Sequence, residues 1–160
     1  MSRIGITGHS NLPSTTDALV DKALRGALTR FASDQPLVGV TCLAEGADQI
    51  FARAVLDLGG RLEVILPASD YREEKVKPEN LAIFDELLGQ ATDVRYMPFD
   101  QSGSEAYMAA STSLIAACDR LFAVWDGRPS EGFGGTADVV AYARKQGVPV
   151  EIVWPEGATR

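Results

Sequence analysis

The sequence predicts an α/β protein, a three-layer sandwich in which helices cover both faces of a largely parallel sheet of about six strands. Apolar runs of strand length alternate with helical patterns over almost the whole chain. Several of these runs, such as 121–125, are continuously apolar, which is typical of strands covered on both faces. This regular alternation favours right-handed crossovers between parallel strands.

Six segments have the length and composition of strands. They are residues 3–7, 37–42, 61–66, 93–97, 120–125 and 148–154. The polar segments 67–80 and 99–103 are expected to be longer loops, and residues 155–160 a loose tail.

The first two helices are predicted from their ends and their apolar spacing. Helix 14–32 opens with the capping-box sequence Ser-Thr-Thr-Asp. Segment 47–58 places its apolar residues on one stripe, which indicates an amphipathic helix. Gly59, with Gly60 behind it, supplies a left-handed stop for that second helix.

Three further helices follow along the chain. Pro78 fits the first turn of a helix that ends near residue 89. A fourth helix covers roughly 104–117, and a fifth covers 136–146 and stops at Gly147.

Composition limits the classes of function. The chain has 160 residues, enough for one sizeable core, so we expect a single domain over 1–160. With 15 Lys and Arg against 22 Asp and Glu, the net charge is −7, which argues against a protein that grips nucleic acid through a basic face. No apolar run approaches the roughly 20 residues of a membrane span, and no secretory signal is expected at the start.

Metal chemistry is not expected. Cys42 and Cys118 each lie in or beside an apolar run, and His9 is the single histidine, so the ligands of a structural zinc site are missing. We interpret both cysteines as free thiols of a cytoplasmic protein.

Three glycine-containing loops follow predicted strands, where ligands bind in parallel sheets. They are Gly8-His9-Ser10, the loop with Gly46, Ala47 and Asp48, and the loop with Gly132, Gly134, Gly135 and Thr136, which is reached from its strand through Asp126. Glycine lets backbone approach a ligand closely, and the N–H groups at a helix start favour an anion such as phosphate. The three loops together predict a phosphate-binding crevice at one edge of the sheet.

Individual side chains have two interpretations each. His9 either contacts a ligand or bonds a neighbouring carbonyl group, and Ser10 either binds phosphate or caps a helix. Asp48 and Asp138 either meet a ribose or metal, or stabilise a helix dipole. The loop 67–80, with Tyr71, Arg72, Lys75 and Lys77, is either a lid that reaches a phosphate or a solvated loop. Trp125 is interpreted as core at a strand end rather than as a platform on which a base stacks.

Two segments resemble a known family. The stretch 39–48, Gly-Val-Thr-Cys-Leu-Ala-Glu-Gly-Ala-Asp, is similar to the Rossmann domain of DNA-processing protein A. The segment 117–125, which runs on to 132–136, resembles the Lonely Guy (LOG) phosphoribohydrolases and the molybdenum-cofactor carrier proteins. These groups form the SLOG superfamily of Rossmann-like nucleotide binders, and the resemblance extends from residue 4 to about 153.

The LOG motif Pro-Gly-Gly-x-Gly-Thr-x-x-Glu aligns with residues 131–139. Gly132, Gly135 and Thr136 match it, so the resemblance implies a phosphate-binding role for them. Glu131 replaces the motif's proline, Phe133 its second glycine and Val139 its glutamate, with Asp138 the nearest carboxylate. The catalytic arginine of LOG enzymes aligns with Ala110.

The leading hypothesis is therefore a binding protein, a sensor or carrier for a nucleotide or nucleotide-derived phosphorylated small molecule. The first alternative is a nucleoside-monophosphate phosphoribohydrolase that uses Asp138 as its carboxylate. The second is single-stranded DNA binding, which the net charge disfavours. LOG-like relatives pair through the helix that here carries Met108, Leu114 and Ile115, so the resemblance also implies a homodimer. The same three residues also fit a helix core.

Overall fold

The computed structural model describes residues 2–32, 35–130 and 132–160. Its sheet has six strands in the order β4-β3-β2-β1-β5-β6, and every neighbouring pair is parallel. The strands are β1 (Ser2–Gly8), β2 (Leu37–Thr41), β3 (Arg61–Leu66), β4 (Asp93–Tyr96), β5 (Arg120–Val124) and β6 (Val150–Ile152). The predicted α/β class and parallel sheet are confirmed.

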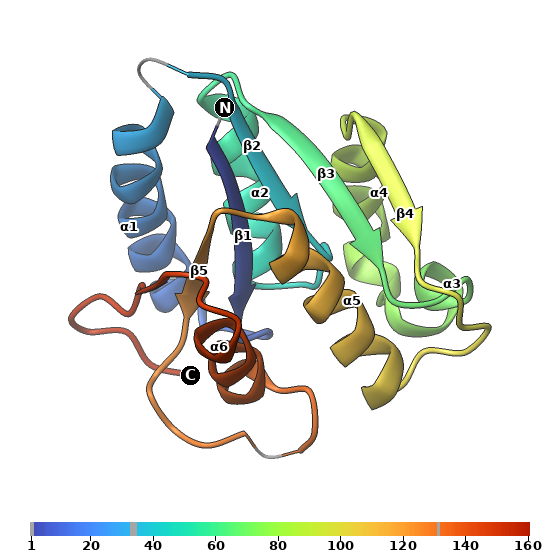
Figure 1. The fold of residues 1–160 in the computed structure, drawn as a ribbon. Coiled ribbons are helices and arrows are strands. Elements are labelled where there is room, and N and C mark those ends of the chain that lie inside the picture. The colour runs from blue at the N-terminus through green and yellow to red at the C-terminus, as the bar shows by residue number, and fades with distance from the viewer. Residues whose placement is uncertain (1, 33–34, 131) are drawn as a thin grey trace.

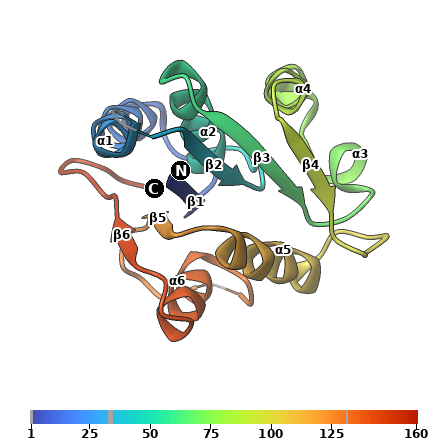
Figure 2. The same ribbon diagram turned by 45° about the horizontal axis from the view of Figure 1, so that its top comes forward.

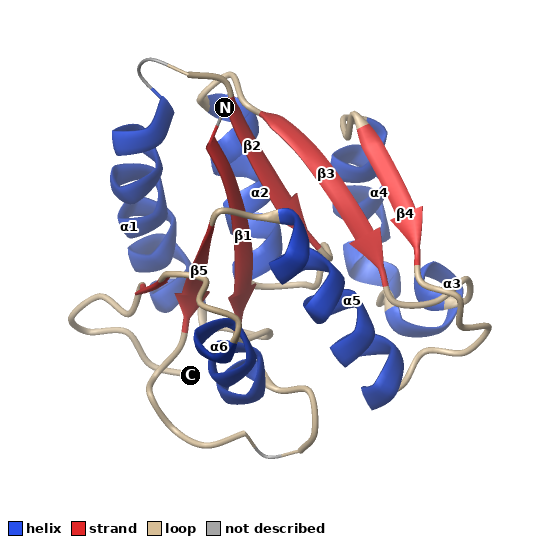
Figure 3. Ribbon diagram, in the orientation of Figure 1, coloured by secondary structure: helices blue, strands red, loops and turns tan. Residues whose placement is uncertain are grey.

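Helices cover both faces of this sheet, as Figures 1 and 2 show. One face carries α1 (Ser14–Ala32), α2 (Ala47–Asp57) and α4 (Leu81–Gly89). The other carries α5 (Ser104–Ala117) and α6 (Thr136–Lys145). Figure 3 separates the layers by secondary structure. All five predicted helices are present, although Pro78 begins a 3₁₀ turn (Pro78–Asn80) that leads into α4.

Each face of the sheet has its own buried apolar cluster. Leu62, Val64 and Leu66 of β3 pack in the cluster under α1, α2 and α4, whereas Ile65 of the same strand packs in the cluster under α5 and α6. Because successive side chains of a strand point to opposite faces, a strand covered twice must be apolar at both. This explains the continuous apolar runs.

The structure differs from the expected loops in two places. The segment 67–80 contains a short helix, α3 (Tyr71–Lys75), whose first residue is buried. Residues 155–160, expected to be a loose tail, are held to the body of the protein. Thr16 Oγ1 donates to the carbonyl of Thr159 at 2.7 Å and accepts from its N–H at 2.9 Å.

No helix within the described ranges combines the length and the apolar character that a membrane crossing requires.

Candidate functional site

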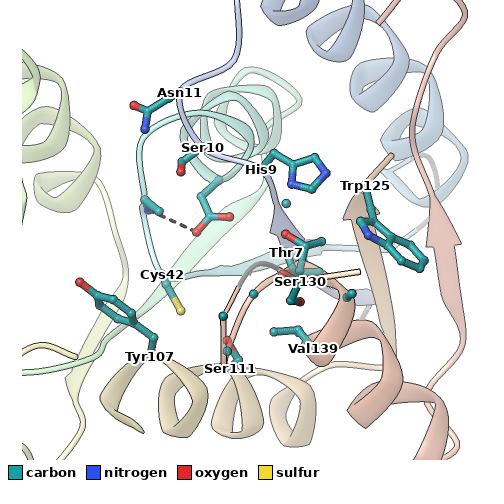
Figure 4. Close-up of a pocket in the computed structure, with 18 of the residues that line it drawn as sticks. Thr7, His9, Ser10, Asn11, Cys42, Tyr107, Ser111, Trp125, Ser130 and Val139 are labelled. Carbon is teal, nitrogen blue, oxygen red and sulfur yellow. Dashed lines mark hydrogen bonds between the residues drawn. The ribbon is translucent and has the colours of Figure 1, made fainter. Parts of the chain in front are cut away.

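A cleft of about 590 Å³ lies where β1, β2 and β5 end. All three predicted loops contribute to its lining, together with α3, α5 and the final residue, Arg160. Figure 4 shows Thr7, Ser130 and Val139 side by side in the cleft, with Tyr107 on one flank and Trp125 on the other. Parallel strands bring distant loops to one edge, and here that edge is hollow.

The loop before α6 is closed by its own side chains. Asp138 accepts a hydrogen bond from the N–H of Gly134 at 2.9 Å, and Ser130 Oγ accepts one from the N–H of Asp138 at 3.2 Å. Gly134 has φ of +87°, a left-handed conformation that suits glycine. The N–H groups of Thr136 and Ala137 have no acceptor among the described residues, as expected for the first turn of a helix.

The loop before α2 packs directly on the loop after β1. The N–H of Ala47 donates to the carbonyl of His9 at 3.2 Å. Gly46 has φ of +100°, and a Cβ atom there would lie 2.8 Å from the His9 carbonyl oxygen. A Cβ on Gly8 would lie 2.6 Å from that of Ala47. Both glycines are therefore required by the close approach of these two loops.

Both ring nitrogens of His9 have polar neighbours, and the Asp126 carboxylate also lies 3.3 Å from Nε2. The N–H of Asp126 lies 3.1 Å from Nε2, and Arg160 Nη1 lies 2.9 Å from Nδ1. Trp154 makes an edge contact with the ring. Burial and then the charge of Arg160 lower the pKa of His9, although the nearby Asp126 carboxylate opposes them. His9 is therefore held as a neutral imidazole at the edge of the cleft.

Eight of the eleven predicted binding residues line the cleft, whereas the other three and the predicted catalytic residue, Asp138, do not. The lining residues are Gly8, His9, Ser10, Asp48, Gly132, Gly134, Gly135 and Thr136. The others lie behind them: Gly46 and Ala47 in the packed loop, Asp126 between His9 and Arg160, and Asp138 on Gly134. Asp138, predicted as a catalytic carboxylate, accepts a hydrogen bond within its own loop through Oδ2.

Two further predictions need correction. Trp125, interpreted as core, lines the cleft, and its Nε1 donates to the carbonyl of Arg128 at 2.8 Å. Arg72, offered as a lid residue, is paired with Asp85 at 2.7 and 2.8 Å and does not line the cleft. Lys75 and Lys77 of the same segment do line it.

Two of the α5 residues that were expected to form either core or a partner surface lie in the core. Leu114 and Ile115 of α5 are buried in this chain's own core, so they are not available as a partner surface. Glu131, the position that replaces the motif's proline, lies outside the described residues.

Sequence reasoning missed several residues of the cleft. Tyr107 and Ser111 belong to α5 and line the cleft. The sequence pattern of this segment predicts only a helix packed on the core, so it gave no indication of a site. Arg160 came from the expected tail. Cys42, at the end of β2, was interpreted only as a thiol.

Charge in the cleft is mixed. The lining contains the cationic residues Lys75, Lys77, Arg128 and Arg160 and the acidic residues Glu45 and Asp48. Burial raises the pKa of Asp48 to about 7, partly offset by the hydrogen bond that its Oδ2 accepts from the N–H of Ala44. Within the described part of the chain, His, Cys, Asp and Glu side chains form no group of three that could hold a metal ion.

The fold and the cleft define a Rossmann-like α/β protein whose candidate ligand site lies at the carboxyl ends of its strands. Neither a protein-family model nor a curated protein matches the chain. Solved structures do match it.

DNA processing protein A from Streptococcus pneumoniae aligns with 98% of the chain at 17% identity and a TM-score of 0.72. The chain spans 52% of that protein, about half its length. DNA processing protein A from Helicobacter pylori, described by its single-stranded DNA binding mode, aligns with 99% of the chain and 68% of its own length, at 15% identity and a TM-score of 0.68.

The molybdenum cofactor binding protein from Rippkaea orientalis aligns with 97% of the chain and 77% of its own length, at 16% identity and a TM-score of 0.60. These neighbours belong to two of the groups that the sequence resembles. The resemblance is thereby confirmed at the level of the fold.

Proposed function

We propose that this protein binds a phosphorylated small molecule of the nucleotide class in the cleft and acts as its sensor or carrier. The observation that carries the proposal is the convergence of three loops, from β1, β2 and β5, on one cleft of about 590 Å³. That volume is within the range of ordinary small-molecule sites, roughly 300–1,000 Å³. Structural neighbours that bind a molybdenum cofactor support a small-molecule ligand.

The phosphate lies at the start of α6 in this proposal. The N–H groups of Thr136 and Ala137 are available there, and the helix dipole places partial positive charge at the same point. Lys75 and Lys77 add positive charge to the lining of the cleft. Oriented amides and a few cations can hold an anion even in a chain of net charge −7.

Binding is better supported than cleavage of the N-glycosidic bond. The position that carries the LOG glutamate is Val139, which lines the cleft but is buried and apolar. The position of the LOG arginine is Ala110, which is fully buried. Asp138, the substitute carboxylate, is bonded to Gly134.

Single-stranded DNA binding, taken from the Helicobacter pylori neighbour, is the weaker candidate. Of the four cations that line the cleft, Arg160 is already paired with Asp126 at 3.0 Å. A chain of charge −7 also lacks the electrostatic attraction on which binding to many phosphates depends.

Thermal-shift measurements with nucleoside 5′-monophosphates test the proposal. A ligand at 100 times its Kd adds about 2.7 kcal/mol of stability, which is readily measured. The sharpest variant is Thr136→Pro, because proline at the first helical position removes one N–H without removing a helical hydrogen bond. Gly135 has φ −70° and ψ 176°, an extended conformation that a following proline accepts.

The matched control is Thr136→Ala, which removes the hydroxyl and keeps the N–H. We expect Thr136→Pro to lose the ligand-induced shift and Thr136→Ala to keep most of it. A ligand-induced thermal shift of full size in Thr136→Pro would show that the phosphate does not bind at the start of α6. The absence of any shift with the wild-type protein across the nucleotide series would contradict the proposal itself.

A further inference from the structure

The lining of the cleft includes two buried side chains, Asp48 and Tyr71, whose polar atoms have unused hydrogen-bonding capacity. Asp48 is 7% exposed and Tyr71 is 8% exposed, and both line the cleft. Oδ2 of Asp48 accepts a hydrogen bond from the N–H of Ala44 at 3.2 Å. Oδ1 of Asp48 and the hydroxyl of Tyr71 have no hydrogen-bond partner among the described residues. Among the described residues, Asp17 Oδ1 is the only side-chain nitrogen or oxygen atom that is both enclosed and unpaired, so the unpaired atoms of Asp48 and Tyr71 are open to the cleft. A polar ligand group in the cleft can therefore pair with them.

The Asp48–Tyr71 pair, which we call the sugar subsite, is fixed in place. The centroid of the Tyr71 ring lies 6.1 Å from that of Phe84 and 6.3 Å from that of Tyr107, and the two tyrosine rings are perpendicular. Asp48 lies in the first turn of α2, held by the Ala44 bond. Neither side chain is free to swing out to solvent.

The two groups have complementary chemistry. Burial, and then the charge of Asp48, raise the pKa of the Tyr71 hydroxyl, so it stays protonated and can donate. Oδ1 of Asp48 accepts when the group is ionised, the form favoured above its raised pKa of about 7. A ligand amine would satisfy Asp48 alone, and a ligand phosphate or carbonyl would satisfy Tyr71 alone. A hydroxyl group both donates and accepts, so hydroxyls fit this pair best.

We infer that the sugar subsite binds the ribose hydroxyls of the nucleotide and makes the cleft selective for ribonucleotides over deoxyribonucleotides. The inference rests on the proposed function, because it requires the phosphate of the same molecule at α6. It extends that function by naming the sugar. The selectivity also separates this site from a DNA site, since deoxyribose lacks the 2′-hydroxyl.

Isothermal titration with three series of nucleoside 5′-monophosphates tests the inference: ribose, 2′-deoxyribose and 2′,3′-dideoxyribose. We expect loss of the hydroxyls to weaken binding by about tenfold or more, the effect of losing one hydrogen bond that leaves a buried partner unpaired. Asp48→Asn keeps an oxygen for the N–H of Ala44, and Tyr71→Phe keeps the ring contacts. In both variants the ratio of the affinities for the ribose and 2′-deoxyribose series should fall close to one.

Matched controls are Asp57→Asn and Tyr142→Phe, which change residues outside the lining and should keep the preference. Thr136→Pro should weaken all three series by the same factor, since it acts on the phosphate.

Equal binding of the three series by the wild-type protein would overturn the sugar subsite and leave the proposed function standing. An equal loss in all series from Asp48→Asn and Tyr71→Phe would also overturn it, since the pair would then only shape the cleft. If no series binds, the proposed function fails, and the subsite with it.

Discussion

Arg160 Nε lies 3.0 Å from Oδ2 of Asp126, so the last residue of the sequence is joined to the loop after β5. The same guanidinium contacts the ring of His9, the residue after β1. One side chain therefore connects two of the three loops that form the cleft. Burial alone would raise the pKa of Asp126, but the hydrogen bond from the N–H of Arg128 and the charge of Arg160 lower it, so its carboxylate stays ionised.

The pKa of His9 should lie below its ordinary value of 6.5. As the single histidine of the chain, it gives one imidazole resonance series that NMR can follow against pH. Arg160→Ala removes one cause of the shift, so the pKa should rise toward 6.5. A wild-type value at or above 6.5 would show that the ring is not enclosed as described.

His9 also predicts the direction of a pH effect on stability. Because the folded protein disfavours the imidazolium, the unfolded chain binds more protons once the pH falls below 6.5. The contribution of His9 is therefore fully present above pH 6.5 and declines as pH falls toward the lowered pKa. Urea unfolding of the wild-type protein and His9→Gln should differ by less at pH 5 than at pH 7.5.

Asp48 makes the stability of the protein depend on pH in the direction opposite to that of His9. Its pKa is raised from 3.8 to about 7, so folding disfavours the carboxylate, and stability is lost as pH rises from about 4 to about 7. The shift corresponds to on the order of 4 kcal/mol. Asp48→Asn lacks this loss, so its stability relative to the wild-type protein should increase across that window and level off above it. A constant difference from pH 4 to pH 8 would rule out the raised pKa.

Gly46→Ala should destabilise the protein by on the order of 1–3 kcal/mol or more, because it adds strain at positive φ and a clash with the loop after β1. The Cβ would lie 2.8 Å from both the His9 carbonyl oxygen and the Ser10 Cα. Gly59→Ala is the matched control, since Gly59 has φ of +80° and nothing within 4 Å of the added atom. Similar losses in the two variants, measured by urea unfolding, would show that the loops do not need this approach.

Lys75→Ala should weaken nucleotide binding, whereas Arg72→Ala should leave it unchanged. Lys75 lines the cleft, but Arg72 is paired with Asp85 on the exterior. The Arg72 pair is exposed, so its loss should change the stability of the protein little. Titration of both variants with the same nucleotide checks this contrast. Weaker nucleotide binding by Arg72→Ala would show that Arg72 contributes to the site.

The layers and the three converging loops were predictable from the sequence, because periodicity and end signals are local. Gly59, for example, has the positive φ that its position after α2 predicts. The helix α3 was not predictable. Its five residues carry one apolar side chain, Tyr71, whose burial depends on contacts with Phe84 and Tyr107 from distant segments.

The position of Arg160 was missed for a related reason. Its contacts with His9 and Asp126 join residues more than thirty positions apart in sequence, and no local pattern encodes them. Asp138 was placed in the correct turn, but sequence could not show that its carboxylate points back to Gly134.

In the proposed function, the N–H groups of Thr136 and Ala137 at the start of α6 hold the phosphate of the ligand. A titration of the ¹⁵N-labelled protein with a nucleoside 5′-monophosphate, followed through its amide resonances, tests this most directly. We predict that the largest saturable shifts occur at Thr136 and Ala137. Saturable binding that leaves these two resonances unmoved while others shift would contradict the account.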